Sequence, residues 1–219
     1  MKTFKTAYSY NRLKIIGVTM LSFFVLSISV SGCDKKKKDS KAEGAEESKA
    51  GIKVSYEGVN DKLMELESGH LYKSTMTFSW PDGSGGFERA KAASARLYLA
   101  NFNLDPRKGS ISLGADLEGD DHIRVTVFFV GAEGTSGGRG DPPMATGEYT
   151  GDAERFNKIE SATITVVKDG KSVDHDFRKG KISGTLKITS STEDAIEGEI
   201  DIKDDTHAIK GKFRAMPFD

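Results

Sequence analysis

Hydrophobic and polar residues alternate along most of the chain from Tyr72 onward, which is the pattern of strands that bury one face. Three stretches show this alternation between residues 76 and 129. Their apolar positions are Met76, Phe78 and Trp80, then Ile111, Leu113, Ala115 and Leu117, then Ile123, Val125, Val127 and Phe129. Only residues 60–67 and 88–94 fit a short helix instead. The pattern therefore predicts a chain dominated by β-strands.

One hairpin, over residues 162–177, can be predicted in register. A two-residue turn at Asp169-Gly170 favours the type I′ geometry that matches the twist of paired strands. This turn would pair Val166 with Val173, Ile164 with His175, Ala162 with Phe177, Thr165 with Asp174, and Thr163 with Asp176. One face is then apolar and the other polar, so the turn and the alternation agree.

Each of the last three predicted strands carries one glycine on its apolar face, at Gly184, Gly198 and Gly211. A turn at Asp204-Asp205 would place Gly198 opposite Gly211. It would also pair Ile202 with His207, Ile200 with Ile209, and Ile196 with Phe213. A row of glycines leaves a shallow trough, which a core aromatic, a bulge or a ligand can explain. We expect a core aromatic, and the candidates are Trp80, Phe78 and Phe129.

These patterns predict an all-β domain over residues 54–219, an antiparallel β-sandwich with an open β-barrel as the alternative. The 24 glycines and only 5 prolines suit a chain with many turns. From Gly147 onward, strands of the form Gly-x-Phe or Gly-x-Ile follow a Gly-Glu-Tyr-Thr-Gly loop. This region resembles small β-sandwich modules of bacterial surface lipoproteins of uncharacterised function. The resemblance implies the fold and supplies no activity.

Residues 1–32 have the two parts of a secretory signal. Lys2, Lys5, Arg12 and Lys14 precede an uncharged run of 16 residues, shorter than the roughly 20 residues that span a bilayer. The run closes on Val30-Ser31-Gly32-Cys33, which resembles the lipobox of bacterial lipoproteins. The resemblance implies a diacylglyceryl group on the Cys33 thiol, cleavage before Cys33, and acylation of the new amine. Two or three acyl chains would anchor the protein firmly in a membrane.

The lipidated Cys33 and the charged stretch after it, residues 33–53, are predicted to form a disordered tether. Residues 34–51 contain no large apolar side chain, so they have nothing to bury. Such a coil would hold the domain roughly 25 Å from the lipid. Lys35–Lys38 is either plain solvated tether or an attraction to anionic headgroups, on the order of 1 kcal/mol per lysine. Asp34 resembles an inner-membrane retention signal of enteric bacteria, and we assign neither membrane.

The net charge and the single cysteine exclude several classes of function. Removal of the leader takes four basic residues and no acidic one, which leaves 28 basic and 33 acidic residues and a net charge of −5. A negative surface disfavours nucleic-acid binding. With its only cysteine lipidated, the mature domain has no thiol for a disulfide, for catalysis or for metal binding. We therefore expect a domain held together by its own core and working without a cofactor.

Catalytic patterns are weak in this sequence. The four histidines, His70, His122, His175 and His207, match no compact metal motif, although three of them lie within two residues of acidic side chains. We expect them to be structural, with no two close enough to share a metal. The chain has no Gly-x-Ser-x-Gly nucleophile elbow, and its glycine-rich segments lack the Gly-Lys-Ser/Thr ending of a phosphate loop.

The segment of residues 131–147 is the most unusual part of the predicted domain, because loops of this length are often either functional or disordered. It contains the integrin-type tripeptide Arg139-Gly140-Asp141. Candidate binding residues in and beside the loop are Arg139, Asp141, Glu148 and Tyr149. A plain mobile loop is the simpler interpretation.

Two functions from different classes follow. The preferred one is a lipid-anchored protein of the cell envelope that binds an envelope protein, a glycan or a small ligand and is not an enzyme. The alternative is a metal-assisted hydrolase that uses histidines and acidic turns.

Overall fold

The described part of the chain, from residue 51 onward, forms a domain that consists mostly of strands. A computed structural model describes residues 51–106, 113–138, 141 and 144–218. The strands are β1 (Gly51–Tyr56), β2 (Val59–Glu65), β3 (Ser68–Pro81), β4 (Phe87–Ala100), β5 (Ile123–Glu133), β6 (Gly147–Thr150), β7 (Lys158–Lys168), β8 (Lys171–Asp176), β9 (Ser183–Ser191), β10 (Ile196–Lys203) and β11 (Ala208–Phe218).

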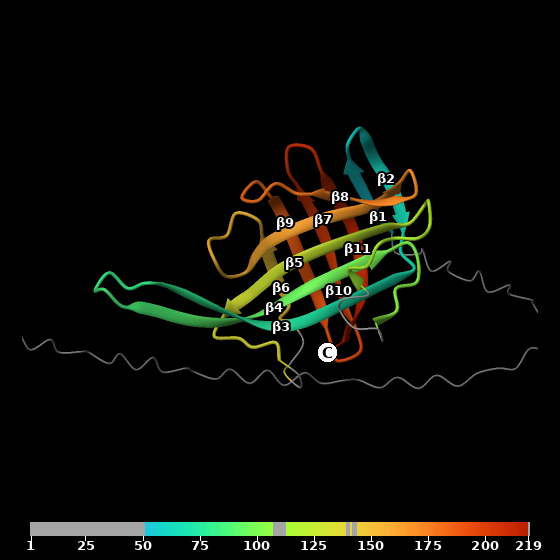
Figure 1. Cartoon of the computed structure of the whole chain (residues 1–219). Coiled ribbons are helices and arrows are strands. Elements are labelled where there is room, and N and C mark those ends of the chain that lie inside the picture. Colours follow the sequence, from blue (N-terminus) through green and yellow to red (C-terminus); the bar gives the residue numbers. More distant parts are fainter. Residues whose placement is uncertain (1–50, 107–112, 139–140, 142–143, 219) are drawn as a thin grey trace, which may run out of the picture. The chain divides into compact units, whose positions relative to one another are not determined.

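All eleven strands join one mixed sheet, in the order β10-β9-β6-β7-β5-β4-β3-β11-β1-β2, with β8 paired to β7 (Figure 1). Strand β10 pairs with β11 as well as with β9, so the hydrogen-bonded path returns to its start. Most pairs are antiparallel, but β11 with β3 and β6 with β7 are short parallel pairs. The all-β prediction is confirmed, and the sheet is consistent with a sandwich or an open barrel.

Alternation along the strands produces the core. Strand β10, for example, alternates strictly between buried and exposed positions along its whole length. The inward faces of the strands meet in one hydrophobic cluster, whose fully buried members include Ile52, Leu71, Leu97, Phe129, Ile164, Leu186 and Ile196. Burial of each such side chain stabilises the fold by about 1.5–3 kcal/mol relative to exposure.

The predicted register of the β7–β8 hairpin is confirmed. Ile164 lies opposite His175 and Val166 opposite Val173. Asp169 and Gly170 both have positive φ, at 53° and 72°, as a type I′ turn requires. On the polar face the threonine hydroxyls donate to the opposite carboxylates: Thr163 to Asp176 and Thr165 to Asp174, each at 2.7 Å.

The predicted register of the β10–β11 hairpin is wrong by two residues. Ile202 pairs with Ile209 and Gly198 with Phe213, because the turn has four residues instead of two. The Asp204 carboxylate causes this, since it accepts hydrogen bonds from the backbone N–H groups of Thr206 at 2.8 Å and His207 at 2.7 Å. A shift of two residues leaves every side chain on its predicted face.

Asp204 also binds the connection between β8 and β9, because its carboxylate accepts a hydrogen bond from the Arg178 N–H at 2.7 Å. Burial alone would raise the pKa of Asp204. The hydrogen bonds from backbone N–H groups and from the His207 ring outweigh burial and lower its pKa to about 2. The charged form of Asp204 is therefore the form that the fold stabilises.

We predict that Asp204→Asn destabilises the domain by about 1–2 kcal/mol near neutral pH, because the hydrogen bonds lose their charged acceptor. A carboxyl group with a depressed pKa stabilises the fold above its unfolded value of 3.8 and loses this effect as pH falls toward about 2. Urea unfolding should therefore show a difference at about pH 6 that shrinks toward about pH 2. Asp205→Asn is the matched control, since that side chain is 70% exposed. A constant difference across this range would contradict the assignment.

The row of glycines accommodates a core aromatic, as expected, but the occupant is Phe213 and not Trp80, Phe78 or Phe129. A Cβ atom at Gly198 would lie 2.7 Å from Cζ of Phe213 and would also overlap the Lys187 carbonyl. Gly198 and Gly211 are not cross-strand neighbours, and Gly211 lies against the backbone of β1 instead. The glycines therefore mark close packing of side chain and backbone, and the ligand explanation for the trough is wrong.

Three further expectations need correction. Residues 60–67 and 88–94 are not helices, because hairpin pairing makes them parts of β2, the following connection and β4. Residues 113–117 lie outside any strand, while Ile111 lies outside the described residues. Leu113 is nevertheless buried, in a second cluster with Tyr98 and Leu104. The domain also begins before residue 54, since β1 starts at Gly51 and Ile52 is buried in the core.

The alternation at Met76, Phe78 and Trp80 does form a strand, within β3. The far part of the β3–β4 hairpin extends beyond its neighbours as a two-stranded arm, since β4 pairs with β5 only as far as Ala92 (Figure 1). The three side chains are only half-buried there. They belong to the surface of the arm and not to the core.

Candidate functional site

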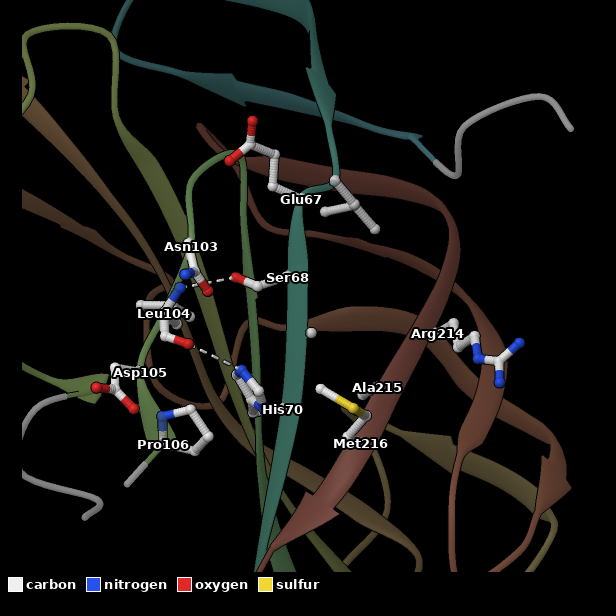
Figure 2. A pocket seen from close by; sticks show the side chains of 12 residues that line it. Glu67, Ser68, His70, Asn103, Leu104, Asp105, Pro106, Arg214, Ala215 and Met216 are labelled. Atoms are coloured by element: carbon white, nitrogen blue, oxygen red, sulfur yellow. Dashed lines mark hydrogen bonds between the residues drawn. The ribbon is translucent and has the colours of Figure 1, made fainter. Parts of the chain in front are cut away.

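A groove of about 520 Å³ opens where β3 and β11 separate (Figure 2). The two strands pair in parallel only between residues 70–72 and 216–218, because β11 pairs with β1 over residues 208–211 instead. Leu71 and Ala215 are in the core, so His70 and Met216 project to the opposite face of the sheet. We call the opening the β3–β11 groove. Residues 68–70 lie at its floor, between a wall of residues 103–106 and a wall of residues 214–216.

The first wall is held by hydrogen bonds to β3. The Ser68 hydroxyl donates to the Phe102 carbonyl at 2.7 Å and accepts from the Leu104 N–H at 3.2 Å. The His70 ring bonds the Leu104 carbonyl through Nε2, at 3.2 Å. These bonds attach the connection after β4 to the start of β3, so the groove exists before any ligand arrives.

His70 is the buried polar side chain of the groove, at 2% exposure. Because a carbonyl can only accept, Nε2 carries the proton, and Nδ1 is an acceptor in the neutral ring. Nδ1 is buried and has no hydrogen-bond partner among the residues that the structure describes. Burial lowers the pKa of His70, while the bond to Leu104 and the charge of Asp105 act in the opposite direction. The groove therefore contains a neutral histidine whose acceptor is unsatisfied.

The charges around the groove are mostly acidic. Among the described residues, Glu67 and Asp105 line it, together with the cation Arg214. Figure 2 shows the Arg214 guanidinium directed away from the groove. It pairs there with Glu197 of β10, with 3.5 Å between the nitrogen and the carboxylate oxygen. Arg214 therefore offsets the charge of Glu197 on β10 more than the charge of the carboxylates that line the groove.

The other three histidines lie outside the groove, and each makes ring contacts with neighbouring side chains. His122 stacks on Phe102, with ring centroids 4.2 Å apart, and its Nδ1 accepts from the Gly119 N–H at 3.2 Å. His175 and His207 form a tilted ring contact with 6.1 Å between their centroids, and the His207 ring also bonds the Asp204 carboxylate through Nδ1, at 3.1 Å. The expectation that no two histidines are close enough to share a metal stays a prediction. In the described part of the chain, no group of three or more His, Cys, Asp or Glu side chains is placed to hold a metal ion.

Of the four candidate binding residues in and beside residues 131–147, the structure describes three and brings two of them together. Arg139 lies outside the described residues. Asp141 and Tyr149 both line a smaller hollow of about 280 Å³, whereas Glu148 is exposed on the other face of β6 and pairs with Lys187 at 3.4 Å. Asp141 and Tyr149 therefore lie together at this hollow, and Glu148 does not join them.

Both residues in this hollow serve the loop itself. The Asp141 carboxylate accepts hydrogen bonds from the Ser136 hydroxyl and the Gly138 N–H, each at 2.7 Å, and these bonds lower its pKa. The Tyr149 hydroxyl donates to the Ala145 carbonyl at 2.8 Å, and burial raises the pKa of Tyr149 to about 12. These contacts explain the two residues as parts of a folded loop, so the β3–β11 groove is the better candidate site.

Sequence reasoning did not find the groove. His70 was noticed only as one of four histidines, and Glu67, Asp105 and Met216 were not singled out. The site depends on a parallel pair between residues about 146 positions apart, His70 and Met216. No local motif predicts such a contact. Alternation shows which face of its strand a side chain occupies, but it does not show which other strand lies beside that strand.

No element within the described residues is a helix with the length and hydropathy needed to cross a bilayer. The sequence matches no known family model, and it matches neither a curated protein nor a solved structure.

Proposed function

We propose that this chain is a lipid-anchored lipoprotein of the cell envelope whose β-domain binds a ligand in the β3–β11 groove. The groove carries the binding part of the proposal. It combines walls already held by hydrogen bonds, apolar lining at Leu104 and Met216, and a buried histidine, His70, in its floor. Concave sites with apolar lining and a few placed polar groups are typical of ligand binding.

The polar groups of the groove favour binding over catalysis. The Ser68 hydroxyl is bonded to two backbone groups, and His70 is bonded through Nε2 to Leu104 and not to Ser68. A serine nucleophile would need a base within hydrogen-bond reach, with the hydroxyl directed at it. The alternative, a metal-assisted hydrolase, has no observation in its favour among the described residues.

The anchoring part of the proposal rests on the leader and the lipobox at Cys33. Lipid at Cys33 would hold the domain at the envelope surface through the residues that precede β1 at Gly51. The binding partners compatible with this location are an envelope protein, a glycan or a small ligand. The domain's negative charge continues to disfavour nucleic acid.

We predict that Met216→Trp weakens ligand binding several-fold, because the larger side chain on the wall fills part of the groove. Met216 is 54% exposed, so the substitution should leave the fold intact. A fragment library screened against the full chain by ligand-observed NMR supplies the probes. Phe87→Trp is the matched control, since Phe87 is 67% exposed on the distant β3–β4 arm. Absence of any hit, or hits that are equally weakened by both substitutions, would refute a binding site in the groove.

A further inference from the structure

The β3–β4 arm, residues 76–81 and 87–91, has two open edges (Figure 1). Strand β4 pairs with β5 only as far as Ala92, and β3 pairs with β11 only over residues 70–72. In the part of the chain that the structure describes, no further strand pairs with either edge of the arm. A two-stranded hairpin by itself is only marginally stable in water, and a third strand stabilises it.

The backbone groups of β3 point out of the arm at Thr77 and Ser79. On β4, the Lys91 carbonyl accepts a hydrogen bond from the Gly134 N–H at 2.8 Å, outside the hairpin, and Lys91 lies opposite Thr77. In an antiparallel ladder, two opposite residues direct their N–H and C=O groups either toward each other or both away, and the two cases alternate. Thr77 and, two residues later, Ser79 therefore direct these groups away from β4, where a further strand could bind them.

The two edges of the arm differ in their protection against pairing. The β4 edge carries the charged residues Glu88, Arg89 and Lys91, whereas β3 has no charged residue from Ser74 to Pro81. Strand β3 also pairs with β4 along its whole length without a bulge. Charges and bulges are features by which proteins prevent an edge strand from pairing with another chain. The β3 edge lacks both, and its β-branched and aromatic residues favour a strand.

One face of β3 in the arm is apolar and already held in place. Met76, Phe78 and Trp80 share this face and are half-buried. The Phe78 ring meets the Phe156 ring edge to face, with 5.2 Å between centroids, and the Arg155 guanidinium lies 4.5 Å from the centroid of the Trp80 ring. Side chains that are ordered before a partner arrives lose less conformational entropy on association.

We propose that the β3 edge of the arm pairs with the β3 edge of a second copy of this chain, antiparallel and centred on Phe78. In this register Phe78 lies opposite its own equivalent, and Met76 lies opposite Trp80 of the second copy. Thr77 lies opposite Ser79 of the second copy, so residues with outward backbone groups meet and exchange hydrogen bonds. No charged residue lies in the paired stretch, so no like charges oppose each other.

The edge fits a second copy because it is complementary to itself. A twofold axis brings the same surface to both sides of an interface, so an uncharged edge with one apolar face meets an edge of the same kind. The aromatic pair at Phe78 and the contacts of the Met76 sulfur with Trp80 stabilise the joined sheet. A register centred on Thr77 would place Trp80 opposite Ser74 and lose an apolar pair. The pairing lies outside the β3–β11 groove and requires no ligand there.

Disulfide cross-linking of the full chain, in cells treated with a mild oxidant, tests the register. Phe78→Cys places two thiols at the twofold axis, in a non-hydrogen-bonded pair whose Cβ atoms lie close together, and should give a cross-linked dimer. Met76→Cys is the matched control on the same face, because its two copies would lie about 13 Å apart along the strands and should not cross-link. The wild-type chain shows any disulfide through Cys33, the only natural cysteine.

A pair of proline variants identifies the edge. Ser79→Pro removes an N–H that points out of the arm, retains the bonds between β3 and β4, and should weaken the dimer about tenfold. Arg89→Pro makes the same change at the residue opposite Ser79, on the β4 edge, and should leave the dimer intact. Native mass spectrometry of the full chain in a non-ionic detergent, over a dilution series, measures the fraction of dimer.

Selective cross-linking of Phe78→Cys, together with loss of the dimer in Ser79→Pro alone, would support the paired arms. Equal cross-linking of Phe78→Cys and Met76→Cys would overturn the register in favour of random collision. Equal loss of the dimer in both proline variants would overturn the β3 edge as the interface. A cross-linked product whose mass differs from that of two copies would overturn the second copy in favour of another protein. A monomer at every concentration, without cross-links, would overturn the proposal entirely.

Discussion

Replacement of Cys33 with serine is expected to abolish the incorporation of fatty acid and to release the protein from the membrane fraction. The lipobox resemblance implies a thioether at this residue, and Cys33 is the only cysteine in the chain, so no second thiol can substitute. Anchoring depends on the acyl chains, each buried CH₂ of which contributes about 0.8 kcal/mol. Metabolic labelling with palmitate, followed by separation of membrane and soluble fractions, measures both effects.

Two control variants distinguish the motif from the thiol. Ser31→Ala retains a small residue in the lipobox and should be labelled like the wild type. The double variant Cys33→Ser with Ser40→Cys restores a thiol outside the lipobox and should remain unlabelled. Undiminished label in Cys33→Ser would refute lipidation at this residue, and label in the double variant would show that position in the motif is unimportant.

Substitution of Gly198 by valine is expected to destabilise the domain by on the order of 1–3 kcal/mol, because it overfills a packed site. A Cβ atom at Gly198 would lie within 2.7–2.9 Å of two atoms of the Phe213 ring. It would also overlap the Lys187 carbonyl, which belongs to the backbone of β9 and cannot rotate away. Urea unfolding at neutral pH measures the change in the free energy of unfolding.

The control for this substitution lies on the same strand. Glu199→Val adds the same residue to the outward face of β10, where Glu199 forms only an exposed ion pair with Lys212, and it should change stability by less than about 1 kcal/mol. Combining Gly198→Val with Phe213→Leu should not restore stability, because the overlap with the Lys187 carbonyl remains. A neutral effect of Gly198→Val would mean that β9, β10 and β11 pack differently.

Several features of the fold were determined by the sequence alone. The two-residue Asp169-Gly170 turn leaves one register for β7–β8, and the structure has that register. The faces of β9, β10 and β11 were also predicted correctly, although the β10–β11 pairing was not. Side-chain direction repeats every two residues, so an error of two positions in the turn does not change which residues are buried.

Other features depended on contacts that a local pattern does not contain. The turn at Asp204 has four residues because one carboxylate collects three backbone N–H groups, including that of Arg178 from another connection. Leu63 and its neighbours resemble a helix by spacing, yet pairing with β1 makes them a strand. Tertiary pairing outweighs weak local preference because each paired residue gains backbone hydrogen bonds and burial together.

The candidate site, like the fold, was predicted only in part from the sequence, and tertiary contacts decided the rest. Sequence patterns identified most of the strands, and they predict the leader and the lipobox, which stay predictions. The β3–β11 groove was decided only by the tertiary structure, since it lies where β11 leaves β1 and joins β3 in parallel. Alternation specifies a buried and an exposed face for each strand, but the free energy that selects its neighbour comes from the packing of the whole sheet.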